Sequence, residues 1–229
     1  MKKSEILVSI TGQTRKSWQN KLKEIEKLGI NRVALFVECY GPKERVKIYE
    51  ALLKSSIKTI PFVHARHDMD LDEFKFLMKK YKTKFFNLHV ECFDKLDKLR
   101  GIHKKLLYEH SFSNTINSKV KMEEIGGFCI DLSHFKSAEE RWTNEFEFVF
   151  SRRKTKRYFI ANHLNGYDPV KRTDIHTPKS NKDFDYLETL PDFVFGKYIA
   201  LEMFNSIKQQ LKFKEYIMKK LKGKVKIKN

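Results

Sequence analysis

The fold is decided by a pattern that first occurs at residues 6–39, ILVSITGQTRKSWQNKLKEIEKLGINRVALFVEC. Residues 6–10 form a short apolar run rich in β-branched side chains, which is typical of a buried strand. Residues 17–28 follow with apolar side chains at helical spacing and end at Gly29, and residues 32–39 form a second apolar run. A strand, a helix and a strand in this order predict a right-handed βαβ unit with parallel strands. The helical spacing is carried by Trp18, Leu22, Ile25 and Leu28.

The same alternation repeats along nearly the whole chain. Eight segments are predicted as strands, at residues 6–10, 32–39, 59–64, 84–90, 106–109, 127–132, 157–163 and 198–203. Helices are predicted at residues 17–28, 42–53, from 71 onward, 94–103, 137–150 and 205–221. Eight parallel strands alternating with helices predict a (β/α)8 TIM barrel, with a doubly wound open sheet as the alternative.

The chain is predicted to form one domain over residues 1–229, because no Pro/Gly/Ser-rich linker or change of composition divides it. A basic helix and tail are expected at about residues 205–229. The helix at residues 137–150 is predicted to start at a capping box formed by Ser137 and Glu140, and residues 111–121 are predicted to form a loop with a short helix.

The net charge is strongly positive, since 47 Lys and Arg face 29 Asp and Glu, which gives 47 − 29 = +18. Basic side chains that neutralise phosphates favour a nucleic-acid partner. A compositional origin competes with this interpretation, because only ten of the 47 basic residues are Arg and the chain is rich in Lys, Ile, Phe and Asn. Charge alone therefore does not decide the partner.

The sequence also favours some locations over others. No run of about 18 apolar residues is present, so we expect no membrane-spanning helix and no membrane partner. The first ten residues lack the apolar core of a secretory signal, and the three cysteines are widely spaced, as reduced thiols are. These features predict a cytoplasmic protein.

Polar side chains collect where the predicted strands end, which is the face on which TIM barrels carry their active sites. Nine residues at these ends are of types that bind divalent cations through carboxylate oxygen or imidazole nitrogen. They are His64, His89, Glu109, Asp131, His134, His163, Asp174, His176 and Glu202. Two of them, His89 and Glu202, lie in otherwise apolar strands, where burial is costly without a partner. We therefore predict a metal site, with His67 left open as an alternative to His64.

Several of these residues stand in an order that resembles a known family. Gly127-Phe-Cys-Ile-Asp131-Leu-Ser-His134, Asn162-His163-Leu-Asn165, Arg172-Thr-Asp174-Ile-His176 and Leu201-Glu202 resemble the signature of the endonuclease IV group, which belongs to the xylose-isomerase-like TIM barrels. The resemblance runs from about residue 57 to residue 205.

This resemblance implies up to three zinc ions and a hydrolase that cuts phosphodiester bonds in abasic or damaged DNA. It implies catalytic roles for Glu109 and Glu202, with Glu109 bridging two ions. The implied ligands of the first ion are His64 and His89, those of the second are Asp131, His163 and Glu202, and those of the third are His134, Asp174 and His176. Substrate contacts are expected from Asn165, Arg172 and Lys179.

The sequence lacks two elements with which the endonuclease IV group contacts DNA. The family's glycine-rich segment is replaced by residues 177–183, and its Tyr-Leu wedge has no counterpart after His64. One alternative is therefore a sugar or sugar-phosphate isomerase or epimerase of the same superfamily, which needs one manganese, magnesium or cobalt ion held by Glu109, Asp131, His163 and Glu202. A further alternative is an inactive barrel that serves as a binding module.

Overall fold

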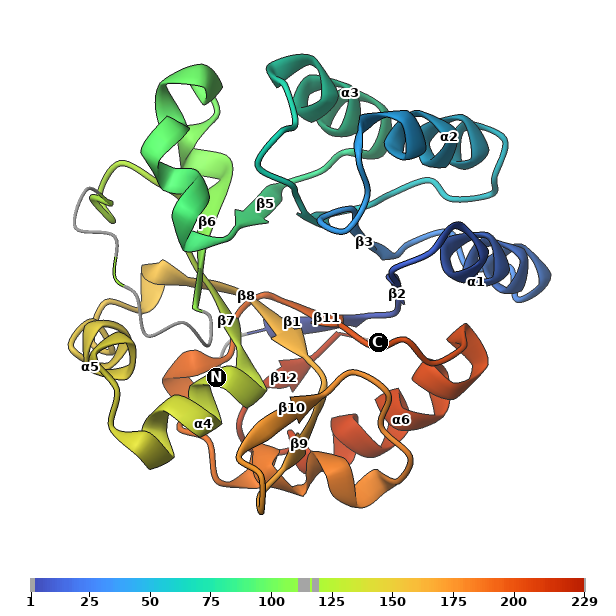
Figure 1. Ribbon diagram of the computed structural model, residues 1–229. Helices are drawn as coiled ribbons and strands as arrows, with labels where there is room; N and C mark the ends of the chain where they lie inside the picture. Colours follow the sequence, from blue (N-terminus) through green and yellow to red (C-terminus); the bar gives the residue numbers. More distant parts are fainter. Residues whose placement is uncertain (1–2, 111–115, 117–119, 229) are drawn as a thin grey trace.

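The computed structural model describes residues 3–110, 116 and 120–228, and Figure 1 shows strands enclosed by helices. Parallel strands pair in chain order from β2 to β8, then β11 and β1. Because β1 and β2 are one strand interrupted at Val8, the pairing of β1 with β11 and of β2 with β3 closes the sheet into an eight-stranded barrel. The barrel strands are β1 (Lys3–Leu7) continued by β2 (Ser9–Ile10), β3 (Ala34–Phe36), β4 (Phe62–His64), β5 (Phe85–Leu88), β6 (Leu106–His110), β7 (Gly127–Asp131), β8 (Phe159–Leu164) and β11 (Tyr198–Leu201).

Helices lie around the outside of this barrel (Figure 1). The α-helices are α1 (Arg15–Lys27), α2 (Pro42–Leu53), α3 (Leu71–Tyr81), α4 (Leu132–Arg141), α5 (Asn144–Phe150) and α6 (Ile207–Lys220). Short 3-10 segments complete the layer: η1 (Val90–Leu99), η2 (His103–Lys105), η3 (Lys156–Tyr158), η4 (Asn181–Glu188) and η5 (Asp192–Val194). Two further pairings are the antiparallel hairpin of β9 (Gly166–Asp168) with β10 (Thr173–Ile175), and the parallel pairing of β12 (Lys226–Ile227) with β1.

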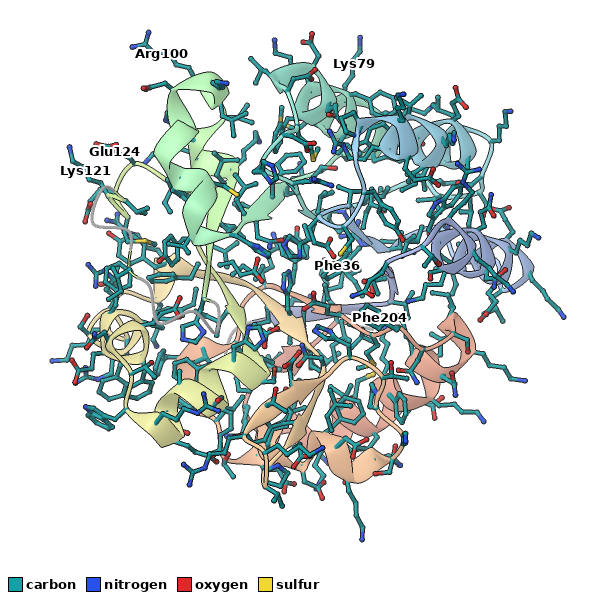
Figure 2. The ribbon with its side chains drawn as sticks, in the orientation of Figure 1. Phe36, Lys79, Arg100, Lys121, Glu124 and Phe204 are labelled. Carbon is teal, nitrogen blue, oxygen red and sulfur yellow. The ribbon has the colours of Figure 1, made fainter. Side chains whose placement is uncertain are left out.

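Two apolar clusters fill the molecule. The larger one packs the helices onto the outer face of the barrel. The smaller one fills the barrel interior, with Phe36, Phe62 and Tyr198 as its bulkiest members, and Figure 2 shows Phe36 near the middle of the molecule. The barrel is therefore closed by side chains below the strand ends, which leaves the carboxyl rim as the place for chemistry. The interior cluster consists of Leu7, Ala34, Phe36, Phe62, Leu107, Cys129, Ala161, Tyr198 and Ala200.

The predicted barrel is confirmed, and the alternative open sheet is wrong. Each of the eight observed strands overlaps a predicted segment. The C-terminal helix is also present as α6, and the tail beyond it is anchored, since β12 pairs with β1 and the backbone N–H of Lys228 donates to Ser4 O. Lys220 of this basic region is ion-paired with Asp185 and Glu188. Most of the predicted loop at residues 111–121 lies outside the described residues.

The predicted helix at residues 137–150 is wrong at its start and in its continuity. The Asp131 carboxylate accepts a hydrogen bond from the His134 backbone N–H, so it caps a helix that begins at Leu132. Trp142, with a left-handed φ of 52°, ends that helix, and Thr143 caps the next one. Ser137 lies inside α4, where its hydroxyl donates to the carbonyl oxygen of Arg172 instead of capping. The expected helix at 94–103 is the 3-10 segment η1.

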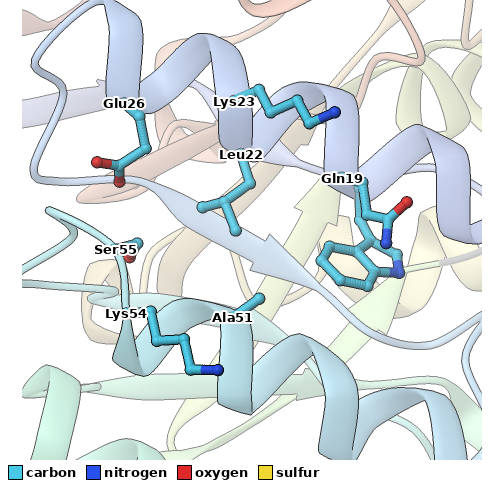
Figure 3. A pocket seen from close by; sticks show the side chains of 8 residues that line it. Gln19, Leu22, Lys23, Glu26, Ala51, Lys54 and Ser55 are labelled. Carbon is cyan, nitrogen blue, oxygen red and sulfur yellow. The ribbon is translucent and has the colours of Figure 1, made fainter.

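Away from the rim, the outer surface carries a groove of 380 Å³ between α1 and α2, seen in Figure 3. Trp18, Leu22 and Ala51 form its apolar part, and none of the nine predicted metal ligands belongs to the described residues that line it. Within the described part of the chain, no helix has the length and apolarity that crossing a membrane requires.

Gly196, just before β11, lies against the backbone of β8, so a larger residue should not fit there. A Cβ atom at this position would lie 2.4 Å from the carbonyl carbon of Ile160 and 2.5 Å from the nitrogen of Ala161. We expect Gly196→Ala to lower the free energy of unfolding by roughly 2 kcal/mol or more, because strand backbone must move. Urea denaturation measures this change.

Gly41→Ala is the matched control, since a Cβ atom there meets nothing within 4 Å and the φ of Gly41 is −67°. It should cost less than about 1 kcal/mol. Equal stability of the two variants would contradict the close approach of β11 to β8.

Candidate metal centre

Five of the predicted ligands meet inside the carboxyl rim, and we call them the central cluster: His64, His89, Glu109, His163 and Glu202. The buried Glu109 carboxylate is in the middle. Its Oε2 lies 3.1 Å from His64 Nε2 and 3.4 Å from His89 Nε2, and its Oε1 lies 3.2 Å from His163 Nδ1. One carboxylate therefore contacts imidazoles that come from the ends of three other strands, β4, β5 and β8.

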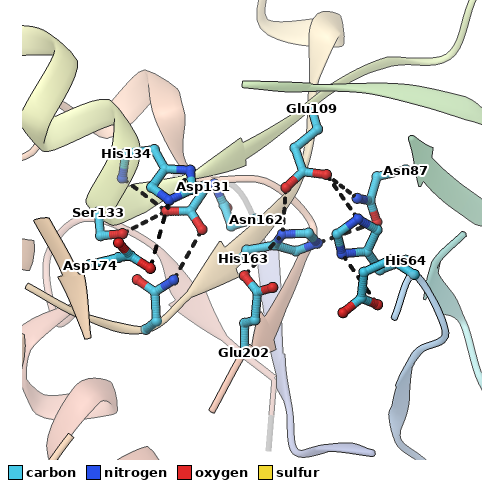
Figure 4. A network of polar contacts seen from close by, with 12 residues as sticks. His64, Asn87, Glu109, Asp131, Ser133, His134, Asn162, His163, Asp174 and Glu202 are labelled. Carbon is cyan, nitrogen blue, oxygen red and sulfur yellow. Dashed lines mark hydrogen bonds and ion pairs between the residues drawn. The ribbon is translucent and has the colours of Figure 1, made fainter. Parts of the chain in front are cut away.

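Glu202, immediately after β11, approaches the cluster from another side. Its Oε2 lies 3.3 Å from the same His163 Nδ1 that Glu109 contacts. Figure 4 shows Glu109 and Glu202 on opposite sides of the His163 ring. Two sets of three ligand atoms, each set with all atoms within 4.8 Å of one another, are formed by His64, His89 and Glu109 and by His64, His163 and Glu202.

The charges of the central cluster depend on one another. Burial alone would raise the pKa of Glu109, but His64, His89 and His163 hold it well below its usual value. Burial also opposes ionisation of Glu202, yet His163 lowers its pKa to about 2. In turn burial would lower the pKa of His163, but Cys129, Glu202 and Glu109 raise it well above its ordinary value. The histidines beside them therefore favour the ionised form of both glutamates.

Asn87 holds this arrangement in place. Its amide nitrogen donates to Glu109 Oε2 at 2.7 Å, and its amide oxygen lies 3.3 Å from His163 Nε2. The sequence prediction missed this residue, although a polar side chain two residues before His89 in an apolar strand lies on the same face of the strand. Asn87 fixes the orientation of two central-cluster residues at once.

Four predicted ligands form a second group beside the first, which we call the outer cluster: Asp131, His134, Asp174 and His176. Asp174 Oδ2 lies 2.7 Å from His176 Nε2 and 3.9 Å from His134 Nε2. The two clusters are adjacent, because His176 Nδ1 lies 3.3 Å from the backbone oxygen of Glu202. The His176 ring also stacks on Phe204 at 5.1 Å.

The Asp131 carboxylate accepts hydrogen bonds from three neighbouring polar groups. Its Oδ1 accepts from the Ser133 hydroxyl and the His134 backbone N–H, and its Oδ2 accepts from the Asn165 amide at 3.1 Å. Among the described residues it belongs to neither of the two ligand sets. Burial is the largest of the effects that raise the pKa of Asp131, and Glu202 and His163 lie close enough to affect it as well, so the grouping of these three residues stays a prediction.

Three residues of the outer cluster, His134, Asp174 and His176, favour their charged forms, whereas burial raises the pKa of Asp131. The hydrogen bond from His134 is the largest of the effects that hold the pKa of Asp174 far below its usual value. Burial opposes the charge of both histidines, but Asp131 and Asp174 raise the pKa of His134 to about 9, and Asp174 and Glu202 raise that of His176 to about 9. The outer cluster thus holds a compact ion-paired group at the edge of the centre.

The three expected substrate contacts and the alternative ligand lie in different surroundings. Asn165 is buried on Asp131, whereas Arg172 is exposed in the β9–β10 turn and lies 3.7 Å from Glu140. Lys179 is exposed in the loop after β10. His67 is exposed in the loop after β4, so the histidine that enters the centre is His64.

Lys21 braces the segment that carries Glu202. This buried lysine of α1 donates a hydrogen bond to the backbone oxygen of Met203, the residue after Glu202. Burial lowers its pKa to about 7, against a smaller opposing effect of Glu24. An ammonium group removed from water at this position should make stability depend on pH.

Comparison with known proteins agrees with the barrel. A solved structure described as a D-tagatose 3-epimerase-like protein superposes with a TM-score of 0.55 at 16% sequence identity, covering 96% of this chain and 97% of that one. No model of a known protein family matches the chain, and no curated protein matches it. The chain thus has the α/β barrel fold of that epimerase-like protein, while the narrower resemblance to the endonuclease IV group receives no support from these comparisons.

Removal of the charge of Glu109 should weaken cation binding, because this carboxylate lies at the middle of the central cluster. We expect Glu109→Gln to lower the affinity for Zn²⁺ or Mn²⁺ by at least about tenfold. Titration calorimetry on protein stripped with a chelator measures this. Glu50→Gln, which removes the same charge on the exposed side of α2, should bind the cation as the parent chain does, and a matching loss in that variant would mean that long-range charge alone is responsible.

Replacement of Lys21 should reveal the pH dependence that its burial causes. Between pH 7 and about 10.5 the unfolded chain keeps a proton on Lys21 that the folded chain has lost, so the parent chain gains stability as pH rises through this window. The free energy of unfolding of Lys21→Met minus that of the parent should therefore fall from pH 7 to pH 10, by up to about 1.4 kcal/mol per pH unit.

Urea unfolding at several pH values measures this difference. Lys23→Met, on the exposed side of the same helix, is the control and should show a difference that does not change with pH. A pH-independent difference for Lys21→Met would contradict a lowered pKa.

Proposed function

We propose that this chain is a divalent-metal-dependent isomerase or epimerase that acts on a small sugar or sugar phosphate. The observation that carries the proposal is the placement of two ionised carboxylates, Glu109 and Glu202, on opposite sides of His163 at the barrel rim. The likeness over almost the whole chain to a D-tagatose 3-epimerase-like protein supports this class above a hydrolase.

The residues of the central cluster suit a divalent cation. Carboxylate oxygen and imidazole nitrogen are donors for manganese, cobalt, magnesium or zinc. Both ring nitrogens of His64 and the Nδ1 of His163 are buried beside carboxylate oxygens, at 3.1 to 3.7 Å, but make no hydrogen bond, which suits nitrogens that would bind an ion shared with those carboxylates. Glu109, His163, Glu202 and His64 would hold the ion, and a bound ion would polarise a substrate carbonyl and stabilise negative charge on its oxygen.

The two glutamates can carry out the proton transfer that such a reaction needs. One carboxylate takes the proton from the carbon next to the carbonyl, and the electron pair of that C–H bond forms the double bond of an enediolate. The other glutamate takes up a proton from solvent and passes it either to the opposite face of the same carbon or to the neighbouring carbon. The first outcome is epimerisation and the second is isomerisation. Because both glutamates lie beside the same His163 Nδ1, at 3.2 and 3.3 Å, both can reach a small substrate bound next to this ring.

The outer cluster would bind the polar end of the substrate. His134, Asp174 and His176 offer both donors and acceptors for sugar hydroxyls. Asn165, Arg172 and Lys179 are proposed as further contacts, with the exposed Arg172 and Lys179 suited to a phosphate group. Phe36 and Phe62, whose rings lie 5.0 and 5.7 Å from that of His163, close the barrel beneath the site.

The outer cluster also favours a second candidate function. A one-metal isomerase does not require Asp174 and His176, which contact each other at 2.7 Å. With His134 they provide the donor types for an additional zinc ion, and together with the net charge of +18 they suit a multinuclear phosphodiester hydrolase acting on nucleic acid.

Hydrogen exchange tests the proposed reaction without knowledge of the natural sugar. Incubation of the Mn²⁺- or Co²⁺-loaded chain in D₂O with a panel of ketoses and their phosphates should place deuterium at the carbon next to the carbonyl, which NMR detects. Glu109→Gln and Glu202→Gln should each slow this exchange by about 10²–10⁴-fold. Glu50→Gln should leave it unchanged.

Metal content separates the candidates. About one ion per chain with sugar exchange supports the isomerase or epimerase. Three zinc ions per chain, incision of an abasic-site duplex and no sugar exchange would overturn the proposal in favour of the hydrolase. Sugar binding without exchange in the fully loaded protein would identify a binding module.

A further inference from the structure

Glu38 is a carboxylate at the rim that the reaction above does not use. It follows β3 directly, and its side chain is only 16% exposed. Its Oε1 accepts from the thiol of the adjacent Cys39 at 3.4 Å. Its Oε2 is buried, has no hydrogen-bond partner, and lies 3.7 Å from Nδ1 of His64.

His64 therefore lies between two carboxylates. Its Nε2 lies 3.1 Å from Glu109, inside the central cluster, and its Nδ1 is directed at Glu38. An imidazole that binds a cation through Nε2 carries its proton on Nδ1, and that N–H needs an acceptor. Glu38 Oε2 is the carboxylate oxygen paired with this nitrogen in the described part of the chain, and a movement of about 0.5–1 Å brings the two atoms to hydrogen-bond distance.

We propose that Glu38 is a positioning residue of the metal centre. Its carboxylate accepts a hydrogen bond from the Nδ1–H of His64, which leaves Nε2 of the same ring unprotonated and free to bind a divalent cation. The inference rests on the metal centre of the proposed function. It assigns a role to a residue that touches neither the substrate nor the ion.

The alternative is that Glu38 is an ordinary buried carboxyl with a packing role. An unpaired carboxylate is costly in a buried environment, and within the described residues no Lys or Arg lies at ion-pair distance from Glu38. A packing role would be served as well by an apolar side chain. The two roles therefore differ in what the removal of the carboxylate does to His64.

The experiment compares Glu38→Ala and Glu38→Gln with the control Glu50→Gln. Zn²⁺ affinity, measured by competition with a chromophoric chelator, should fall about 10–100-fold in Glu38→Ala. The Zn²⁺ affinity should fall less in Glu38→Gln, because the amide oxygen of Gln can still accept a hydrogen bond from the Nδ1–H of His64. Glu50→Gln should bind Zn²⁺ as the parent chain does.

The tautomer of His64 gives a second measurement, which would not change in Glu38→Ala if Glu38 had only a packing role. In protein labelled with ¹⁵N-histidine and loaded with Zn²⁺, the parent chain should show His64 protonated at Nδ1, with its signals assigned from their loss in His64→Gln. Glu38→Ala should lose this defined pattern. Thermal unfolding of the metal-free variants checks that all of them are folded.

The outcomes separate the two proposals. If the parent chain fails to bind Zn²⁺, the metal centre itself is wrong, and the role of Glu38 falls with it. If the parent binds Zn²⁺ and Glu38→Ala binds it equally well with the same His64 tautomer, the positioning role is overturned while the metal centre stands.

Discussion

The charge of Glu109 is the constraint on which the rim of this barrel depends. A carboxylate buried at the end of β6 is tolerated only where other groups compensate it, and here three imidazoles lie within 3.4 Å of it. β4 pairs with β5 and β5 with β6, whereas the histidine from β8 reaches this group across the interior because the sheet closes. The compensation is mutual, since the same carboxylate keeps the buried histidines charged. Barrel closure and the chemistry of the rim are therefore one structural requirement.

Most of the barrel could be predicted because buried parallel strands produce short apolar runs with polar residues at their ends. The prediction fails where two residues could each cap the same helix. Ser137 and Glu140 have the spacing of a capping box, but Asp131 lies six residues earlier and caps the helix first. The Ser137 hydroxyl is then used by the carbonyl oxygen of Arg172, a partner in the β9–β10 turn that no local pattern indicates. Helix starts depend on which of several possible caps the tertiary structure selects.

The sequence predicts which face of the barrel carries the site, but not how the side chains of the site are arranged. The position of a residue at a strand end places it on the correct face, and this holds for His64, Glu109 and His163. It does not tell how each carboxylate is oriented: Asp131 was predicted as a ligand, but its hydrogen bonds with Ser133, the His134 backbone and Asn165 could not be predicted. Asn87 and Glu38 were missed because a search for ligand sets gives no weight to the residues that orient the ligands.

The contacts of the two glutamates favour different tasks for them. Glu109 is held by three imidazoles and the Asn87 amide, whereas within the described residues the side chain of Glu202 has one ion pair, with His163. A carboxylate fixed from four sides is suited to anchoring a cation, because it cannot turn without breaking several contacts. A carboxylate held from one side can rotate between the centre and a substrate. Proteins of one fold perform many reactions, so the difference between Glu109 and Glu202 says more about the chemistry than the barrel does. It favours Glu202 as the carboxylate that takes the proton from the substrate.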